Sequence, residues 1–237
     1  MCRAGRRSGP IEFGLGLPLS PGLALILDMD GVVIHSNPIH RRAWEVFNRR
    51  YGLETTVEMH ERMFGRRNDD IIRDFFGDGL TPAEITSRGA AKEEVYREMV
   101  GGRVVEALVP GIREFLERHA GSLLGLATNA EPANVNFLLD ASGLRRYFRV
   151  IVDGHQVKHP KPDPEIYLLI SRLLRTSPAN CIVFEDSFSG VKAARSAGMR
   201  VVGVRTTHGQ LPGTALEIDN FSNGDLDEWL GKQEARV

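Results

Sequence analysis

Short runs of aliphatic residues recur along the chain, and longer amphipathic stretches separate them. The runs are nearly continuous rather than alternating, and they cover 23–28, 123–128, 149–153, 181–186 and 200–205. Such runs are typical of strands that are buried on both faces of a parallel sheet. Helical spacing of apolar residues follows or precedes the later runs, at 110–121, 131–143, 163–174 and 187–198. Alternating strands and helices predict an α/β fold with a doubly wound parallel sheet.

The long segment between the first and second runs has a different pattern. Helical spacing recurs at 38–52, 68–77 and 81–100, with no convincing strand among them. The last of these stretches begins with Thr81 and Pro82, a favourable N-cap and first helical residue. We therefore predict an inserted all-helical domain over 39–105, which divides an α/β core into 21–38 and 106–237.

Composition narrows the class of protein. Lys and Arg number 30 against 31 Asp and Glu, so nothing favours nucleic acid or a membrane surface as a partner. Only Cys2 and Cys181 are present, which argues against a disulfide framework or a zinc site and favours a reducing cytoplasm. We interpret the basic and then Gly/Pro-interrupted residues 1–20 as a mobile tail, with a secretory signal as the alternative.

Acidic residues follow two of the predicted strands. Asp28 and Asp30 end the first run, and Glu185 with Asp186 ends the fourth. Because ligands of a doubly wound sheet gather beyond the carboxyl ends of its strands, these four carboxylates should meet in one crevice, with Lys161 as the opposing cation. That excess of negative charge calls for a hard divalent cation, and carboxylate oxygens are the ligands that Mg²⁺ prefers.

The same crevice has the groups that phosphoryl transfer requires. Thr128 and Asn129 follow the second run and offer donors to phosphate oxygens, although Thr128 could instead cap the next helix. Asp28 would attack phosphorus and form an aspartyl phosphate. Asp30 would protonate the leaving oxygen and later deprotonate water, while Lys161 would orient the nucleophile and offset phosphate charge.

Four motifs in this order resemble a known family. They are "DMDGVV" at 28–33, "ATN" at 127–129, "KPDP" at 161–164 and "EDS" at 185–187. Together they resemble the signature motifs of the haloacid dehalogenase superfamily, and Asp30 resembles its phosphotransferase branch. The resemblance implies a Rossmann-like core, a mobile helical cap and a flap formed by "GVVIHS". It also implies Mg²⁺ held by Asp28, Asp186 and the backbone carbonyl of Asp30, with Glu185 binding directly or through water.

A finer resemblance runs through the predicted cap. "HRRAW" at 40–44 and "KEEVY" at 92–96 resemble the β-phosphoglucomutase group, which implies that His40 couples cap closure to proton transfer and that Lys92 contacts substrate. The cap arginine of that group aligns nearer Asn68, which leaves Arg66 or Arg67 as its substitutes. His40 could instead be a packed residue, and Lys92 could lie on a solvated helix face.

These observations predict a magnesium-dependent phosphatase of a small phosphorylated metabolite, with a sugar phosphate as the favoured substrate. A capped site excludes macromolecules, and a monomer is the expected state. The segment "TNAE" at 128–131 resembles phosphatases more than mutases. The alternatives are a β-phosphoglucomutase-like phosphohexomutase and a non-catalytic phosphate-binding module. His155 and His159 are interpreted as loop residues without a metal-binding role.

Overall fold

A parallel sheet of six strands forms the centre of the protein in a computed structural model that describes residues 22–63 and 65–235. Its strands are β1 (Ala24–Leu27), β2 (Leu123–Ala127), β3 (Val150–Val152), β4 (Cys181–Glu185), β5 (Arg200–Val204) and β6 (Leu216–Ile218). The spatial order is β3-β2-β1-β4-β5-β6, and every neighbouring pair is parallel. This is the strand order of a Rossmann-like sheet, so the predicted fold class is confirmed.

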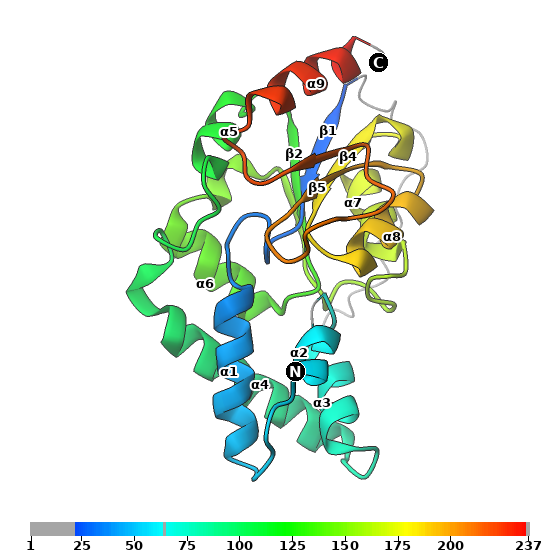
Figure 1. Cartoon of the computed structure of the whole chain (residues 1–237). Helices are drawn as coiled ribbons and strands as arrows, with labels where there is room; N and C mark the ends of the chain where they lie inside the picture. Colours follow the sequence, from blue (N-terminus) through cyan, green and yellow to red (C-terminus); the bar gives the residue numbers. More distant parts are fainter. Residues whose placement is uncertain (1–21, 64, 236–237) are drawn as a thin grey trace, which may run out of the picture.

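Helices cover both faces of the sheet (Figure 1). On one face lie α5 (Ile112–Arg118), α6 (Pro132–Ser142) and α9 (Gly224–Glu234), and on the other lie α7 (Glu165–Leu173) and α8 (Phe188–Ser196). In β1, Leu25 and Leu27 face the first layer, whereas Ala24 and Ile26 face the second. Because both faces are covered, the strand has no polar side, which explains its continuous apolar run.

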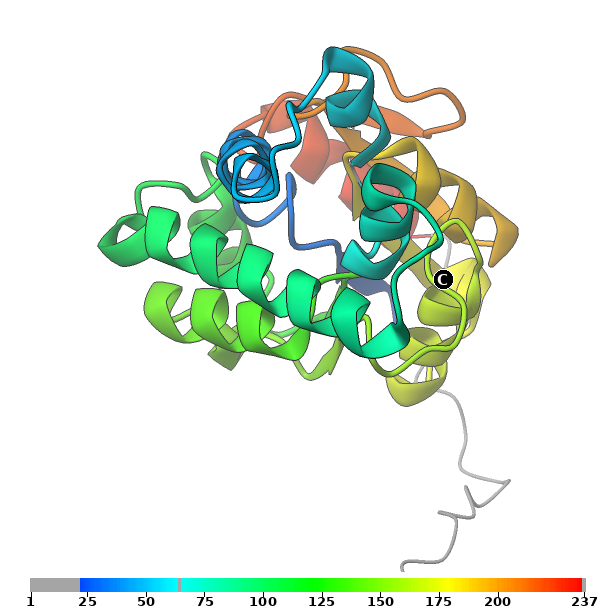
Figure 2. The same ribbon diagram turned by 90° about the horizontal axis from the view of Figure 1, so that it is seen from below.

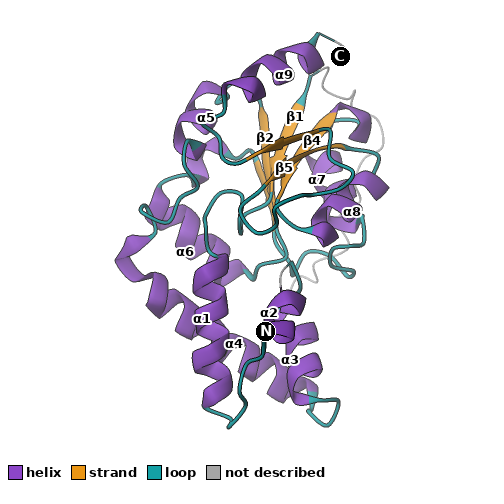
Figure 3. Cartoon of the chain, viewed as in Figure 1, coloured by secondary structure: helices purple, strands orange, loops and turns teal. Residues whose placement is uncertain are grey.

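Four further helices lie beyond the carboxyl ends of the strands, and Figure 2 shows them from below. The secondary-structure colouring of Figure 3 shows no strand among them. They are α1 (Asn37–Arg49), α2 (Val57–Met63), α3 (Asn68–Phe76) and α4 (Pro82–Val100). A separate apolar cluster around Trp44, Phe47 and Ile72 holds them together. Thr81 and Glu84 form a capping box at the start of α4. The limits 39–105 of the cap stay a prediction.

Sequence patterns missed three short or weakly apolar elements, α2, β6 and α9. The predicted tail at 1–20 lies outside the described residues. Among the residues that the structure describes, no helix is both long and apolar enough to cross a membrane.

The carboxyl ends of β1 and β4 lie next to each other in the sheet. β1 and β4 are neighbours, with Leu27 opposite Phe184, and β2 lies on the other side of β1. The chain connections therefore diverge between β1 and β4, where a crevice opens at the carboxyl edge of such a sheet. Gly31 has a φ of 77°, and a Cβ there would lie 1.8 Å from Oδ2 of Asp186. Only glycine fits this close approach.

Candidate active site

A buried lysine joins the two acidic strand ends. The Nζ of Lys161 donates to Oδ1 of Asp28 at 2.8 Å, to Oε1 of Glu185 at 2.6 Å and to the carbonyl of Ala127 at 3.0 Å. These three acceptors come from β4 and from the ends of β1 and β2, and Lys161 as a whole is 3% exposed. Although burial opposes the charge, Asp28 and Glu185 raise the pKa of Lys161 above its ordinary value. Lys161 is therefore a permanent cation at the centre of the crevice.

Glu185 is fully buried and accepts hydrogen bonds on both oxygens. Besides the lysine, Oε1 accepts from the hydroxyl of Tyr167 at 2.7 Å. Oε2 accepts from the backbone amides of Asp186 and Ser187 at 3.1 Å each and from the Ser187 hydroxyl at 3.0 Å. A Cβ on Gly190 would lie 1.8 Å from Oε1, so α8 packs directly on the carboxylate. These bonds fix the orientation of the Glu185 carboxylate in the crevice.

Asp186 points toward the turn after β1. Its Oδ2 accepts from Nδ2 of Asn37 at 2.9 Å and from the hydroxyl of Thr207. Asn37 opens α1, and Thr207 follows β5, so residues far apart in sequence hold this carboxylate. The glycine at position 31 makes room for its oxygen.

Three buried carboxylates fit a hard divalent cation. One oxygen each from Asp28, Glu185 and Asp186 lies within 4.8 Å of the others. Burial and the charge of Glu185 raise the pKa of Asp28 to about 7, although Lys161 acts against this. Burial and the neighbouring charges also raise the pKa of Asp186 well above its ordinary value. Such repulsion between oxygen ligands is what a bound Mg²⁺ relieves, so this donor set fits the ion.

Asp30 lies two residues beyond Asp28 and has its own partners. Its Oδ1 accepts from the hydroxyl of Ser36 at 2.5 Å and lies 3.3 Å from Nε2 of His40. Burial alone would raise the pKa of Asp30, but the bonds to His40 and Ser36 outweigh it and lower the pKa below its ordinary value. The pKa shifts of the two aspartates therefore have opposite directions, because the two carboxylates have different partners.

A second lysine fixes the ring of His40. The Nζ of Lys92 lies 2.8 Å from Nδ1 of His40, and the ring stacks on Tyr96 with centroids 3.8 Å apart. Because an ammonium only donates, Nδ1 accepts and the ring proton sits on Nε2, which faces Asp30. Lys92 is 1% exposed, so it is a buried residue and not part of a solvated helix face.

Glu93 neutralises this lysine and connects the cap to the core. Its Oε1 accepts from Lys92 and from Asn68, each at 2.7 Å, and its Oε2 accepts from Asn134 of α6 at 2.6 Å. Although burial acts in the opposite direction, the charge of Lys92 is the main factor that lowers the pKa of Glu93 to about 2. The carboxylate is thus ionised at neutral pH inside the pocket wall.

Thr128 and Asn129 lie at the predicted strand end and line the pocket. The hydroxyl of Thr128 accepts from the backbone amide of Ala130 at 3.1 Å. The side chain of Asn129 donates to the carbonyl of Gly65 at 2.8 Å and accepts from the amide of Lys161 at 3.4 Å. Their role in phosphate binding stays a prediction.

Arg66 and Arg67, the two arginines predicted to contact substrate, have different surroundings. Arg66 lines the pocket, but its guanidinium donates to Oδ2 of Asp74 at 2.9 Å and to the carbonyl of Arg62 at 3.1 Å. Arg67 points instead at the core, where it donates to the carbonyls of Gly154 and Val157. Whether either contacts substrate stays a prediction.

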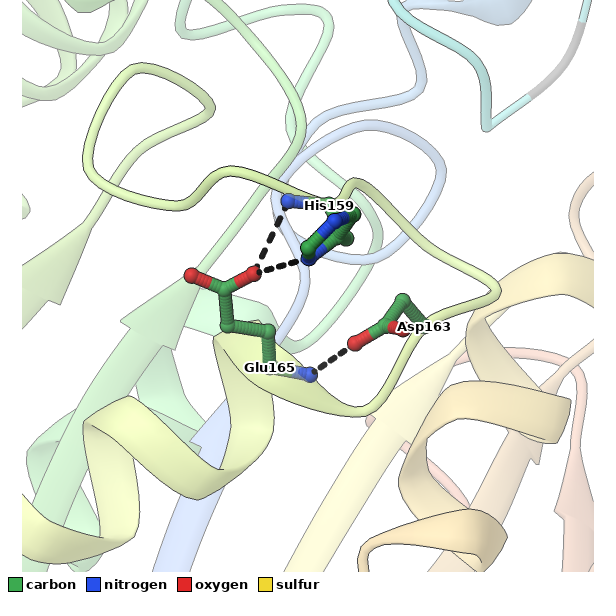
Figure 4. A group of neighbouring side chains, drawn as sticks. All are labelled: His159, Asp163 and Glu165. Carbon is green, nitrogen blue, oxygen red and sulfur yellow. Dashed lines mark hydrogen bonds and ion pairs between the residues drawn. The ribbon is translucent and has the colours of Figure 1, made fainter.

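A second group of possible metal ligands lies at the surface, outside the crevice. Figure 4 shows His159, Asp163 and Glu165 around one loop. Glu165 accepts from the amide and from Nδ1 of His159, at 2.8 and 3.0 Å, and Asp163 accepts from the amide of Glu165 at 2.9 Å. These bonds give each carboxylate a local structural role.

Several residues of the site were not predicted from the sequence: Ser36, Asn37, Glu93, Tyr167 and Thr207. Three of them had a signal: Ser36 ends the "GVVIHS" segment, Asn37 directly follows it, and Glu93 directly follows Lys92 in "KEEVY". Tyr167 and Thr207 come from distant elements, and nothing in the sequence indicates that they meet the carboxylates.

Comparisons with known proteins agree with the geometry. Residues 23–198 match the model of a family described as "haloacid dehalogenase-like hydrolase". The chain is 38% identical over 203 residues to the phosphorylated carbohydrates phosphatase of Thermotoga maritima, which covers 81% of this chain and 89% of that protein. It is 32% identical to fructose-1-phosphate phosphatase YqaB of Escherichia coli, over 76% of this chain and 95% of that protein. The crystal structure of β-phosphoglucomutase from Clostridium difficile has the same fold, with a TM-score of 0.81 and 24% identity over 91% of this chain and 98% of that one.

Proposed function

Because the chain belongs to the haloacid dehalogenase-like hydrolase family, we propose that it is a magnesium-dependent phosphatase of small sugar phosphates with Asp28 as its nucleophile. The main support is the contact of Lys161 with Asp28 and Glu185, beside an Asp30 that has separate partners. Relatives named as phosphatases of fructose 1-phosphate and of phosphorylated carbohydrates support the substrate class.

The first step forms a bond between Asp28 and phosphorus. Lys161 holds one carboxylate oxygen of Asp28, which leaves the other to attack in line with the sugar oxygen. The bond from phosphorus to the sugar oxygen breaks, and the carboxyl group of Asp30 gives that oxygen its proton. The products are free sugar, an aspartyl phosphate at Asp28 and the carboxylate of Asp30.

The second step reverses the role of Asp30. Its carboxylate takes a proton from water, and the water oxygen attacks phosphorus, which releases phosphate and restores both aspartates. The Nε2 proton of His40 stabilises the ionised form of Asp30. Asp28, Asp186 and, by resemblance, the carbonyl of Asp30 would hold Mg²⁺, with Glu185 binding it directly or through water. The ion would neutralise negative charge on the phosphoryl oxygens.

A phosphohexomutase is the second candidate, and the contact of Lys92 with His40 favours it. A mutase has to grip a sugar bisphosphate through cationic contacts to its non-reacting phosphate. The cationic side chains that line this pocket already have anionic partners: Lys161 with Asp28, Lys92 with Glu93, and Arg66 with Asp74. Glu131 adds a further acid to the lining. This charge distribution favours a monophosphate with a neutral sugar end.

The test is phosphate release from a panel of sugar phosphates, with and without Mg²⁺. Asp28→Asn should reduce turnover to background, because an amide does not attack phosphorus, while circular dichroism stays unchanged. Chelation should remove activity and added Mg²⁺ should restore it. Activity of Asp28→Asn within tenfold of the wild type would refute the proposal.

A further inference from the structure

One arginine joins the cap to a loop of the core. Arg67 lies at the start of α3 in the cap, and its guanidinium reaches the loop between β3 and α7. It donates to the backbone carbonyls of Gly154, Val157 and Lys158, at 2.7 Å for Val157 and 3.5 Å for Lys158. A guanidinium has five donors in a rigid fork, which suits several carbonyls at once.

The loop that receives Arg67 leads directly to Lys161 and is held from its other side as well. Glu165 accepts from the backbone amides of Lys158 and His159, at 3.0 and 2.8 Å, and from Nδ1 of His159 (Figure 4). The residue at position 158 thus has its carbonyl bound by the cap and its amide bound by α7. The backbone three residues before Lys161 is therefore held from two sides.

The cap turn next to Arg67 makes a second contact with the core. Asn129 donates to the carbonyl of Gly65 at 2.8 Å and accepts from the amide of Lys161 at 3.4 Å. A Cβ on Gly65 would lie 2.5 Å from Oγ of Ser189, so the turn sits directly against α8. Residues 65–67 and the loop 153–161 therefore meet at one tight junction.

We propose that Arg67 is a positioning residue that latches the closed cap onto the loop carrying Lys161. Its bonds go to neutral carbonyls, and water can replace them when the cap opens. In the closed cap these bonds keep residues 65–67 on the core and restrain the backbone just before Lys161. The inference rests on the proposed function in one respect: it assumes that closure of the cap completes a catalytic site.

Arg62 provides a matched control. It lies in α2 of the same cap, is 54% exposed and pairs with Asp74, a cap residue, at 3.2 Å. Arg62→Met and Arg67→Met remove the same charge and donors, but only Arg67 loses bonds that join the cap to the core. Arg67→Lys keeps the charge and should restore part of the effect, because one ammonium reaches fewer carbonyls than the fork does.

The first readout is the distance between cap and core, measured by pulsed electron paramagnetic resonance. Spin labels go on cysteines at exposed Val57 of the cap and Leu173 of the core, with Cys2 replaced by serine. Arg67→Met should shift the distribution to longer distances and broaden it, Arg67→Lys should give an intermediate result, and Arg62→Met should match the parent protein. This readout requires no turnover, so it decides the latch even if the proposed phosphatase activity is absent.

The second readout is steady-state kinetics with the best sugar phosphate. Arg67→Met should lower kcat/KM by roughly ten- to a hundredfold through both a lower kcat and a higher KM, because the closed cap and Lys161 are held less well. The melting temperature should stay close to that of Arg62→Met. A distance distribution unchanged by Arg67→Met would overturn the latch, whatever happens to activity. If Arg67→Met does not fold, Arg67→Gln serves for both readouts, and failure of both variants to fold would also overturn it.

Discussion

At the residue scale, each acid of the crevice is set by its immediate partners. Asp28 and Glu185 both contact the buried Lys161. Burial raises the pKa of Asp28, and this effect is larger than the lowering by Lys161. Asp30 instead receives bonds from Ser36 and His40, which lower its pKa. Two aspartates separated by one residue therefore have opposite shifts, because their immediate partners differ. The proposed roles of nucleophile and acid/base rest on those separate partners, Lys161 for Asp28 and His40 with Ser36 for Asp30.

We expect Asp30→Ala to reduce kcat for sugar phosphates by roughly a hundred- to ten-thousandfold, the usual contribution of general acid–base catalysis. A substrate with a very good leaving group, such as p-nitrophenyl phosphate, needs little protonation. Formation of the aspartyl phosphate from it should therefore recover, whereas hydrolysis of that intermediate should stay slow. Rapid-quench measurement of both steps checks this. Equal losses in the first step for good and poor leaving groups would remove Asp30 as the acid.

The carboxylate of Glu93 should make stability depend on pH. Its pKa is lowered from 4.5 to about 2, so its ionised form stabilises the folded state by about 3 kcal/mol above pH 4.5. This contribution declines as the pH falls from about 4.5 toward 2, because protons then bind the unfolded chain more readily. Glu93→Gln should therefore lower the free energy of unfolding more at pH 7 than at pH 4. Urea unfolding of both proteins at the two pH values measures the difference, and an equal loss at both would contradict the assignment.

At the scale of elements, the junctions between strands and helices determine the site. The end of β4 and the start of α8 enclose the carboxylate of Glu185, and Gly190 in the first turn of α8 leaves just enough room for it. The hydroxyl of Ser187 caps the same helix by accepting from the amide of Gly190 at 3.1 Å. The motif "EDS" thus combines an acid, a candidate metal ligand and a helix cap.

Gly190→Ala should destabilise the protein by at least about 1–3 kcal/mol, because its methyl group would collide with a buried carboxylate that has little space to move. It should also lower activity by displacing the partner of Lys161. Gly231→Ala is the control: it lies within α9, and nothing is within 4 Å of the added Cβ. Alanine there should be neutral or stabilising by roughly 0.5–1 kcal/mol. Thermal unfolding compares the two, and equal effects would show that the carboxylate can move aside.

Elements with strong patterns were predictable, and weak ones were not. The continuous apolar runs of β1, β2 and β4 reflect burial on both faces of the sheet. Such burial can be recognised from the residue types alone. β6 has only three residues, of which Leu216 and Glu217 are half-buried, so the sequence contains no continuous apolar run at this strand. The short helix α2 buries only Met59 and Met63.

At the scale of the whole molecule, the choice between phosphatase and mutase depends on how the cap and core together line the pocket. Glu93 of the cap and Glu131 of the core add negative charge to the lining of the pocket. Arg97 of α4 forms an ion pair with Glu131 at 2.7 Å, and this pair links the cap to the core. A second phosphate on the substrate would find few unpaired cations there.

We therefore expect phosphate release from a hexose phosphate to outpace interconversion of β-glucose 1-phosphate and glucose 6-phosphate. One reaction is followed by two readouts, inorganic phosphate and glucose 6-phosphate, with and without a trace of glucose 1,6-bisphosphate. Glucose 6-phosphate formation that the bisphosphate stimulates and that exceeds phosphate release tenfold would reverse the ranking. His40→Ala and Lys92→Ala would then each have to depress the mutase rate.

The sequence by itself determined the α/β class, the helical insertion and the order of the four motifs, because these depend on local periodicity and on residues within a few positions of one another. Asp28, Asp30, Glu185 and Asp186 could be proposed as site residues for the same reason, since each lies in a short motif at a strand end. Lys161 could be proposed because it opens the motif "KPDP". Only the tertiary structure decided which partners they have. Asn37, Thr207 and Tyr167 reach the carboxylates from α1, the segment after β5 and α7, and no local pattern encodes such meetings. The same holds for Arg67: its neighbour Arg66 looks identical in sequence, and only the docking of the cap on the core separates their contacts.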